Sequence, residues 1–411
     1  MRLLFAFGST VGTFVPVTRG LAHSTLSDAM DKLRRWYRVT ALVTFNSIML
    51  FVFVNLVLFA ILSARTKPDS PLVRYGEDNL LTAYPGWNAQ DVQTLLTETY
   101  ADLKFEYEPF TEFRSKPLRE KFINIDLAGF RFSKTQAPWP PRSDAFNVFV
   151  FGGSTTFGMG LPDDETIASY LQADSVHPIA VYNFGRIFYL SRQEEILFQQ
   201  LLQSGFVPQV AIFIDGLNDF FYPSGEPGFS PRFRRFMAGE SESNPLDRVP
   251  MVRAAHGLKK SEPVQDATEA TLETVATRWR ANKRMIELMA AGFGVRPLFV
   301  WQPVPVYHYD LRYHFLSHST FVRKHGPDTQ RQALLENLWV HGKLGPVRMK
   351  NLADGYALME NLRAQGKLGS NLLWLADSQQ DKQENLYVDA VHYSAAFSKE
   401  IADTINAYLA H

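Results

Sequence analysis

From residue 146 to the C-terminus, short apolar runs alternate with longer stretches that have helical periodicity. We predict strands at the apolar runs 146–151, 179–183, 210–214, 296–301 and 371–375. We predict helices over 165–173, 192–203, 267–291, 326–365 and 395–409. Strands that alternate with helices are typical of a parallel sheet covered on both faces. The pattern therefore predicts an α/β domain over residues 146–411 with strand order 2-1-3-4-5 and a site at the carboxyl ends of the strands.

A second apolar pattern lies near the N-terminus, where the 26 residues from 39 to 64 contain no charge. About 20 apolar residues are enough to span a bilayer. A buried core helix is the alternative, but apolar residues cover all faces of this segment. Basic residues on its N-terminal side are in excess, which places the N-terminus in the cytoplasm. They are Lys32, Arg34, Arg35 and Arg38, against Arg65 and Lys67 on the other side.

We therefore predict a single-pass signal anchor at 39–64 in the cell membrane, with residues 65–411 extracytoplasmic, in the periplasm if the cell is Gram-negative. A cleavable signal is the alternative, because small residues occur at 63–64. Residues 1–38 would form a cytoplasmic tail. Glycine and proline interrupt residues 1–29, which we interpret as an upstream extension of the reading frame before Met30 or as a disordered tail.

The segment 65–145 lacks strong periodicity and is rich in aromatic and turn residues, so we expect it to pack on the main domain. One helix is predicted over 88–103, with Asn88 as its N-cap. The polar, Pro-, Gly- and Ser-rich stretch 221–266 is predicted to be an insertion in the main domain. One face of the predicted helix would carry Val92, Leu95, Leu96, Tyr100 and Leu103.

Composition narrows the function classes. Hydrophobic residues make up 46% and charged residues 20% of the chain, as in an ordinary globular protein. The 42 basic and 42 acidic residues balance, so nothing indicates a nucleic-acid partner. The chain has no cysteine, which excludes disulfides, thiolate metal sites and cysteine catalysis.

The most informative motif follows the first predicted strand of the domain. Gly152-Gly153-Ser154 ends the apolar run, and acidic residues at 163–165 precede the next helical stretch. This order is typical of a strand–turn–helix corner, which would place the serine hydroxyl at the edge of the sheet. Three later segments carry possible partners. They are Asn-Phe-Gly at 183–185, Asp-Gly-Leu-Asn-Asp at 215–219 and Asp-Ala-Val-His at 389–392.

A serine is a poor nucleophile unless a base lies within hydrogen-bond reach. His392 is the candidate base, because an imidazole titrates near neutral pH. Asp389 precedes it by three residues and could hold the imidazole in the productive tautomer. The residues thus indicate nucleophilic catalysis by Ser154.

Together the four segments resemble the SGNH/GDSL hydrolase family, as a membrane-anchored bacterial-type member, over about residues 146–411. The family's Gly-Asp-Ser-Leu is Gly-Gly-Ser-Thr here. The resemblance implies a flavodoxin-like three-layer sandwich, ester hydrolysis and no cofactor. It also implies that the oxyanion is bound by the backbone N–H groups of Ser154 and Gly185 and by the side-chain amide of Asn218.

Other interpretations of these residues stay open. Asp215 and Asp219 could form a paired-carboxylate site, although hydrogen bonding within a turn is the simpler interpretation. Gln302 follows the fourth strand and is predicted to contact substrate, with a rigid exit loop as the alternative. The only other dense cluster of possible ligands is irregularly spaced and favours a loop or lid over a metal site. It comprises His308, Asp310, His314 and His318.

The sequence therefore predicts a membrane-anchored serine esterase that acts on an O-acyl group of a carbohydrate or lipid. One alternative is an O-acyltransferase that modifies a surface polysaccharide on the same scaffold. The other is a non-catalytic glycan-binding or assembly subunit. Neither the acyl group nor the oligomeric state follows from the sequence.

Overall fold

The computed structural model describes residues 20–65, 77–226, 230, 249–252, 268–318 and 345–410. The chain forms two compact units, one of Met1–Lys67 with Ser243–Lys260 and one of Pro68–Glu242 with Ser261–His411. The first part of the predicted tail, most of the predicted insertion and residues 326–344 of a predicted helix lie outside the described residues.

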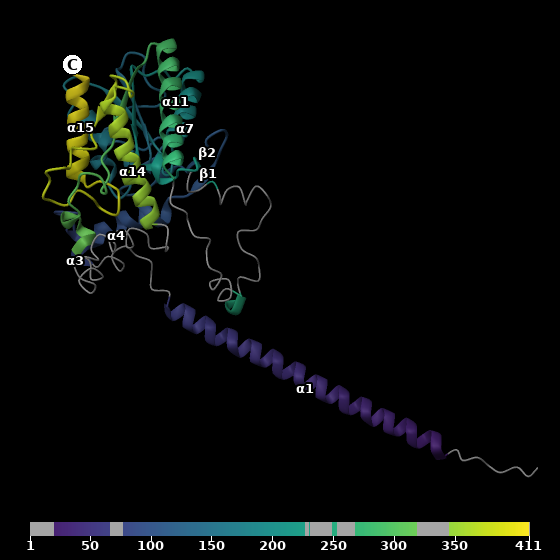
Figure 1. Cartoon of the computed structure of the whole chain (residues 1–411). Coiled ribbons are helices and arrows are strands. Elements are labelled where there is room, and N and C mark those ends of the chain that lie inside the picture. The colour runs from purple at the N-terminus through teal and green to yellow at the C-terminus, as the bar shows by residue number, and fades with distance from the viewer. Residues whose placement is uncertain are drawn as a thin grey trace, which may run out of the picture. The chain divides into compact units, whose positions relative to one another are not determined.

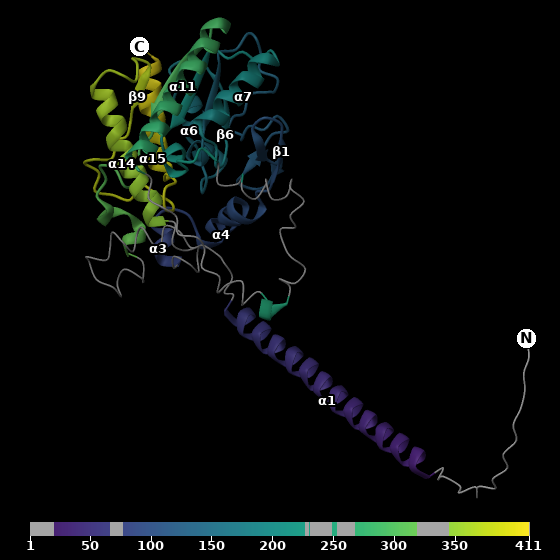
Figure 2. The same cartoon turned by 45° about the vertical axis from the view of Figure 1, so that its right-hand side comes forward.

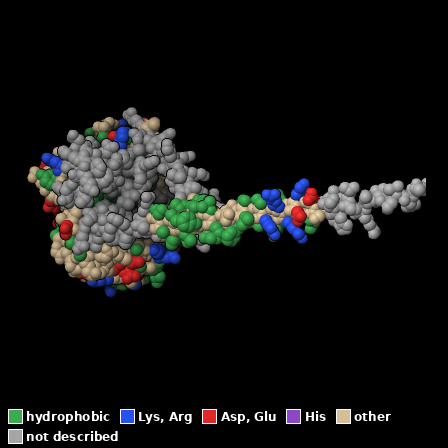
Figure 3. Space-filling model, turned by 90° about the horizontal axis from the view of Figure 1, so that it is seen from below, with side chains coloured by type: hydrophobic (Ala, Val, Ile, Leu, Met, Phe, Trp, Pro, Cys, Tyr) green, Lys and Arg blue, Asp and Glu red, His purple; other side chains and the backbone are tan. Residues whose placement is uncertain are grey.

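The first unit contains one long helix, α1 (Gly20–Arg65), which includes the predicted span 39–64. Between Ser27 and Ile61 this helix is long and apolar enough to cross a membrane. None of its apolar window is buried, unlike the core helix of a soluble domain. Figure 3 shows hydrophobic side chains along the helix, with Lys and Arg gathered toward its N-terminal end. The apolar segment 39–64 is thus helical, and its length and composition fit the predicted membrane span.

The second unit is built on a five-stranded sheet with the order β6-β5-β7-β8-β9, and every neighbouring pair is parallel. In sequence order this is 2-1-3-4-5, so the predicted fold class is confirmed. Each predicted strand is present within one or two residues of its predicted ends. The strands are β5 (Asn147–Gly152), β6 (Ala180–Gly185), β7 (Val210–Asp215), β8 (Arg296–Trp301) and β9 (Leu372–Trp374).

Helices cover both faces of the sheet (Figures 1 and 2). One face packs against α7 (Ser191–Gln203), α11 (Glu269–Phe293) and α14 (Gly345–Ala364). The other packs against α6 (Ile167–Ala173) and α15 (Ala395–Leu409). Ser394 caps α15, its hydroxyl accepting from the N–H of Phe397 at 3.3 Å. The helical periodicity in the sequence therefore predicted the layers correctly.

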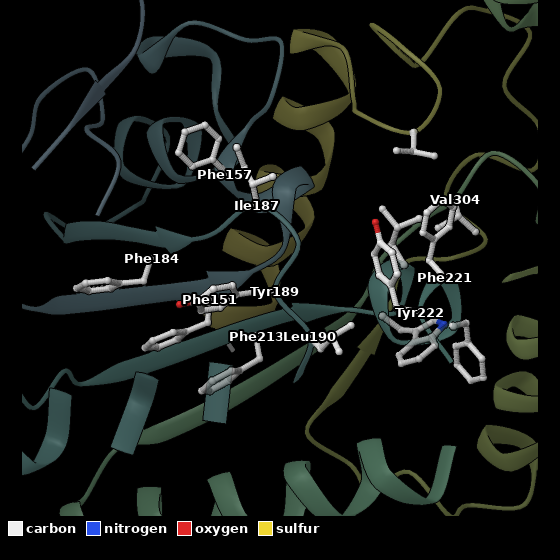
Figure 4. Packing of buried hydrophobic residues seen from close by; sticks show 14 of the residues in the cluster. Phe151, Phe157, Phe184, Ile187, Tyr189, Leu190, Phe213, Phe221, Tyr222 and Val304 are labelled. Atoms are coloured by element: carbon white, nitrogen blue, oxygen red, sulfur yellow. The ribbon is translucent and has the colours of Figure 1, made fainter. Parts of the chain in front are cut away.

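The two faces of the sheet differ in their side chains, because successive residues of a strand point to opposite sides. Valine, isoleucine and leucine form the face under α6 and α15. Phenyl rings of four neighbouring strands stack in register across the other face, with ring centroids 5.7, 4.8 and 5.4 Å apart. Figure 4 shows three of these rings side by side. In order across the sheet the rings belong to Phe184, Phe151, Phe213 and Phe299.

The segment before the sheet contains more structure than its weak periodicity predicts. Two short antiparallel hairpins, β1 (Phe105–Glu108) with β2 (Glu112–Ser115) and β3 (Leu118–Arg119) with β4 (Asn124–Ile125), follow its helices. Apolar side chains from this segment belong to the same core cluster as the phenyl-bearing face of the sheet. The helices are α3 (Glu77–Leu81), α4 (Ala89–Thr97) and the π-helical turn η1 (Glu98–Asp102).

The predicted helix 88–103 begins as expected, since Asn88 accepts from the N–H of Asp91 at 2.9 Å. It does not continue as an α-helix to residue 103, because the chain widens into η1 after Thr97. Tyr100 is 43% exposed, so the prediction that it shares one face with the four apolar residues is wrong. The wider turn changes the register that periodicity assumes. Val92, Leu95, Leu96 and Leu103 are buried as predicted.

Candidate active site

Ser154 lies where β5 meets a one-turn helix, α5 (Ser154–Phe157), with Gly153 as the N-cap residue. Ser154 is buried, with 8% of its surface exposed. The fully buried guanidinium of Arg131 donates to the carbonyl oxygens of Phe157 at 2.8 Å and Gly158 at 2.6 Å. These bonds fix the end of the turn, so the serine is held at a rigid corner of the sheet.

His392 and Asp389 lie on the loop between β9 and α15. Asp389 Oδ1 accepts from the backbone N–H groups of Val391 and His392, both at 2.9 Å. Two backbone bonds close the same loop, from Val388 N to His392 O at 2.9 Å and from Ser394 N to Leu386 O at 2.8 Å. The loop thus orients both side chains through its own hydrogen bonds, independently of the serine.

The three side chains form one continuous chain of hydrogen bonds. His392 Nε2 lies 2.8 Å from Ser154 Oγ, and His392 Nδ1 lies 2.6 Å from Asp389 Oδ2. The serine and histidine are 238 positions apart in the sequence. A hydroxyl, an imidazole and a carboxylate in this order can transfer the hydroxyl proton to the imidazole while the carboxylate stabilises the cation.

The pKa of Asp389 shows that the carboxyl is held in its charged form. Burial alone raises the pKa, but the charge of His392 and hydrogen bonds from His392, Tyr100 and Val391 lower it to about 2. An ionised carboxylate at this position favours the tautomer in which His392 Nδ1 carries the proton. His392 Nε2 is then free to accept from Ser154.

Asn218 lies beside the serine corner on the short helix α8 (Leu217–Phe221). Its side-chain Nδ2 donates to the carbonyl oxygen of Tyr189 at 2.7 Å. A Cβ atom added to Gly153 would lie 2.5 Å from the same nitrogen, so the amide packs directly against the backbone that precedes Ser154. An amide carries two N–H groups, and the second can donate to an oxyanion formed near Ser154.

Gly185 has a different role in the structure from the one expected. Its backbone N–H donates to Asn183 Oδ1 at 2.9 Å. A Cβ atom at this position would lie 2.4 Å from the backbone nitrogen of Phe157 and 2.7 Å from the carbonyl carbon of Thr156. The absence of a side chain therefore lets β6 pack against α5, and the N–H is already bonded within the protein. This arrangement does not support Gly185 as an oxyanion donor.

Gln302 is also not arranged as the predicted substrate contact. It is 3% exposed, and its Oε1 accepts from the hydroxyl of Thr155 at 2.7 Å and from that of Tyr393 at 3.3 Å. Thr155 follows Ser154, and Tyr393 follows His392. Gln302 thus links the turn that carries Ser154 to the loop that carries His392, which its position after a strand does not reveal.

The two aspartates that flank Asn218 are buried together with Glu194 of α7. Asp219 accepts from the hydroxyl of Ser191 at 2.7 Å, and Asp215 accepts from Trp279 Nε1 at 3.0 Å. Burial and the charge of Asp219 raise the pKa of Asp215 to about 7. Burial also raises the pKa of Glu194 well above its ordinary value. These carboxyls are buried, and the bonds to Ser191 and Trp279 connect the residues around Asn218 to α7 and α11. They do not form an open acid/base site.

The described histidines of the segment 308–318 have separate surroundings. His308 Nδ1 pairs with Asp377 Oδ1 at 2.8 Å, and Asp310 pairs with Arg312. His314 is fully buried against Tyr387, and burial lowers its pKa to about 4. Among the residues that the structure describes, no group of three or more His, Asp or Glu side chains is arranged to bind a metal ion.

Tyr100 is a residue near the site that the sequence did not indicate. Its hydroxyl donates to Asp389 Oδ2 at 2.7 Å across 289 positions of sequence. Periodicity predicts this side chain on one helix face with four apolar residues, and no motif marks it. The widened turn η1 brings it to the loop that carries Asp389.

Comparisons with known proteins gave structural similarities alone. No family model matches the chain, and no curated protein matches it. A carbohydrate acetylesterase from Sinorhizobium meliloti is 12% identical, with 64% of this chain and 98% of that chain covered and a TM-score of 0.35. A member of the lipolytic protein G-D-S-L family from Veillonella parvula is 10% identical, with 64% and 96% covered and a TM-score of 0.31.

An acetyl xylan esterase is 11% identical, with 64% of this chain and 99% of that chain covered and a TM-score of 0.34. The solved structures similar to this chain thus include lipolytic proteins of the G-D-S-L type and esterases.

Proposed function

We propose that the protein is a serine hydrolase of the SGNH/GDSL type that cleaves ester bonds through an acyl-Ser154 intermediate. The observation that carries this proposal is the position of His392 between Ser154 and Asp389, at 2.8 and 2.6 Å. The same three residues carry the motif resemblance in the sequence. A non-catalytic binding subunit would have no need of this alignment.

The chemistry follows from these distances. Ser154 Oγ attacks the acyl carbonyl carbon while His392 Nε2 takes the hydroxyl proton. The tetrahedral intermediate collapses when the bond to the alkoxy oxygen breaks and His392 returns the proton to the departing alcohol. A water molecule, deprotonated by His392, then attacks the acyl-serine, and the acid leaves with Ser154 restored.

The tetrahedral intermediate needs donors for its oxyanion. The backbone N–H of Ser154 is at the start of α5, and the Asn218 amide packs against the preceding residue. We assign the oxyanion to these two donors. Gly185 is left out of this assignment because its N–H is bonded to Asn183.

For the location we propose that residues 39–64 of α1 anchor the protein in the cell membrane and that residues 65–411 lie on its extracytoplasmic side. The uncharged length of the helix and the basic residues before it support this topology. For the substrate we propose an O-acylated carbohydrate or lipid, which such a location would offer.

Active-site labelling tests the proposal. A fluorophosphonate should modify Ser154 alone, and peptide mapping would identify the residue. Ser154→Ala should abolish labelling and lower the turnover of a short-chain aryl ester ~10³-fold or more. Modification of another serine, or an unlabelled protein that is correctly folded, would refute the proposal.

Product analysis separates hydrolysis from transfer, which share the acyl-serine and differ in what attacks it. The hydrolase should release free acid at the same rate with and without added glycan. Acyl groups that appear mainly on the added sugar, with free acid at background, would favour the O-acyltransferase.

A further inference from the structure

We propose that Tyr100, supplied by the segment that precedes the sheet, is a positioning residue for the Asp389–His392 pair. This inference rests on the proposed function and concerns the same site. It assigns to the segment 77–145 a part in catalysis that neither the motifs nor the fold class implies.

Both oxygens of the Asp389 carboxylate face hydrogen-bond donors. Oδ1 accepts from the N–H groups of Val391 and His392, which belong to the same loop. Oδ2 faces His392 Nδ1 at 2.6 Å and accepts from the Tyr100 hydroxyl at 2.7 Å. Tyr100 is therefore the donor in this set that comes from a distant part of the chain.

Tyr100 reaches the carboxylate because the helix that carries it changes its register. In a continuous α-helix, Tyr100 would follow Leu96 by four residues and lie on the same buried face. Instead the chain forms the π-helical turn η1, which the N–H of Leu103 closes on the carbonyl of Glu98 at 3.3 Å. Such turns shift the register of the side chains that follow, and they are frequent at functional sites.

Hydrogen bonds from buried side chains fix the turn η1 in place. Glu98 is only 3% exposed, and its carboxylate accepts from the N–H groups of residues 121, 122 and 123 at 3.2, 2.8 and 3.0 Å. The hydroxyl of Thr99 donates to the carbonyl of Leu95 at 2.7 Å. Both residues directly precede Tyr100, so these bonds fix the backbone that leads into it.

The bond from Tyr100 affects the orientation and the charge of the Asp389 carboxylate. A carboxylate can rotate about its Cβ–Cγ bond, and the bond from Tyr100 fixes the oxygen that faces His392 Nδ1. It also adds a donor to a buried negative charge, which helps to keep the carboxyl ionised. Without the hydroxyl, Asp389 would keep its loop bonds but would hold the imidazole less firmly.

The bond between Tyr100 and Asp389 also links two distant segments of the chain, so a structural role is distinguished from a positioning role by what each changes. A merely structural role would change stability and leave the hydrogen bond between Asp389 and His392 as it is. A positioning role changes that bond and lowers kcat while KM is maintained, because the pair acts on the reacting groups and does not hold the substrate.

The experiment compares Tyr100→Phe with wild type in the full-length protein. Tyr408→Phe is the matched control, since Tyr408 is 36% exposed and its hydroxyl bonds to Ser370 O at the far end of α15. The substrate is a short-chain aryl ester, and the melting temperature is measured in parallel. We expect Tyr100→Phe to lower kcat about tenfold with KM within about twofold, and Tyr408→Phe to change neither.

The second readout does not depend on activity. The downfield proton resonance of His392 Nδ1–H reports the hydrogen bond to Asp389, and Tyr100→Phe should shift or broaden it. His392→Ala assigns the resonance by its loss. Comparison with Tyr408→Phe corrects for any general effect of losing a tyrosine hydroxyl.

The outcomes separate this inference from the proposed function. An unchanged kcat with an unchanged His392 resonance in Tyr100→Phe would overturn the inference while wild-type labelling upholds the hydrolase. If wild type neither hydrolyses esters nor reacts with fluorophosphonate, the proposed function fails. The resonance then decides by itself whether Tyr100 positions the pair. A lower melting temperature with kcat and resonance unchanged would assign Tyr100 a structural role only, which also overturns the inference.

Discussion

At the scale of single residues, the site depends on how closely neighbouring groups approach. The Asn218 amide occupies the space in which residue 153 would carry a side chain, 2.5 Å from the Cβ position. The glycine at position 153 therefore leaves the space that this amide occupies. Glycine at 185 has the corresponding effect for the contact between β6 and α5.

Gly153→Ala tests this contact. The added methyl group should displace the Asn218 amide and lower kcat by ~10²-fold, with a small change in KM, because one oxyanion donor is lost. Gly292→Ala is the control, since nothing lies within 4 Å of its Cβ position in α11. If the effect acts through Asn218, the double variant with Asn218→Ala should be no slower than the slower single variant. Additive losses would contradict the mechanism.

Asp389 carries the second prediction at this scale. Asp389→Asn should lower kcat by ~10³–10⁴-fold, because the amide no longer favours the tautomer that accepts from Ser154. The pKa of about 2 also means that the ionised carboxylate stabilises the fold above pH ~4, and that this stabilisation is lost as pH falls toward 2. The melting temperature of wild type should thus fall more steeply between pH 4 and 2 than that of Asp389→Asn. Equal slopes would contradict this linkage.

At the scale of elements, side-chain pattern decides how the sheet is covered. Aliphatic side chains face α6 and α15, and phenyl rings in register face α7, α11 and α14. Stacked rings on adjacent strands contribute beyond the area they bury, since offset aromatic pairs attract. Three carboxyls lie where α7 and α8 meet β7, those of Glu194, Asp215 and Asp219. Their protonation changes with pH, so we expect the stability of this contact to change with pH.

Glu194→Gln tests the contact between these elements. Carboxyls with raised pKa values bind more protons in the folded state, so the free energy of unfolding falls as pH rises from ~4 through about 7, the pKa of Asp215. Glutamine keeps a donor for Asp215 and removes one titrating group. The fall in melting temperature between pH 5 and 8 should therefore be smaller in Glu194→Gln than in wild type. The exposed Glu273→Gln should follow wild type, and parallel curves for all three proteins would contradict the expectation.

At the scale of the whole molecule, the proposed membrane anchor predicts the side on which residues 65–411 lie. We expect alkaline phosphatase fused after His411 to be active and a fluorescent protein fused there to be dark, because basic residues precede the apolar segment. Replacing Lys32, Arg34, Arg35 and Arg38 with neutral residues should weaken this orientation. Bright fluorescence from the wild-type fusion would reverse the proposed topology.

The sequence by itself determined the strands and covering helices of the main domain and their order. Apolar runs and helical periodicity are local properties, so neighbours in the chain are enough to predict the five strands of the sheet, their covering helices, the Asn88 cap and the apolar helix. The same local information marked Ser154, His392 and Asp389, because each motif is short. Their roles remain predictions for the labelling experiment.

The tertiary structure decided which groups meet. Distances of 2.8 Å from Ser154 to His392 and 2.7 Å from Tyr100 to Asp389 join residues 238 and 289 positions apart, and no local pattern reports them. The hydrogen bonds of Gly185 and Gln302 depend on three-dimensional packing in the same way. A residue's type limits which bonds it can make, but the neighbours that packing brings to it decide which bonds it does make.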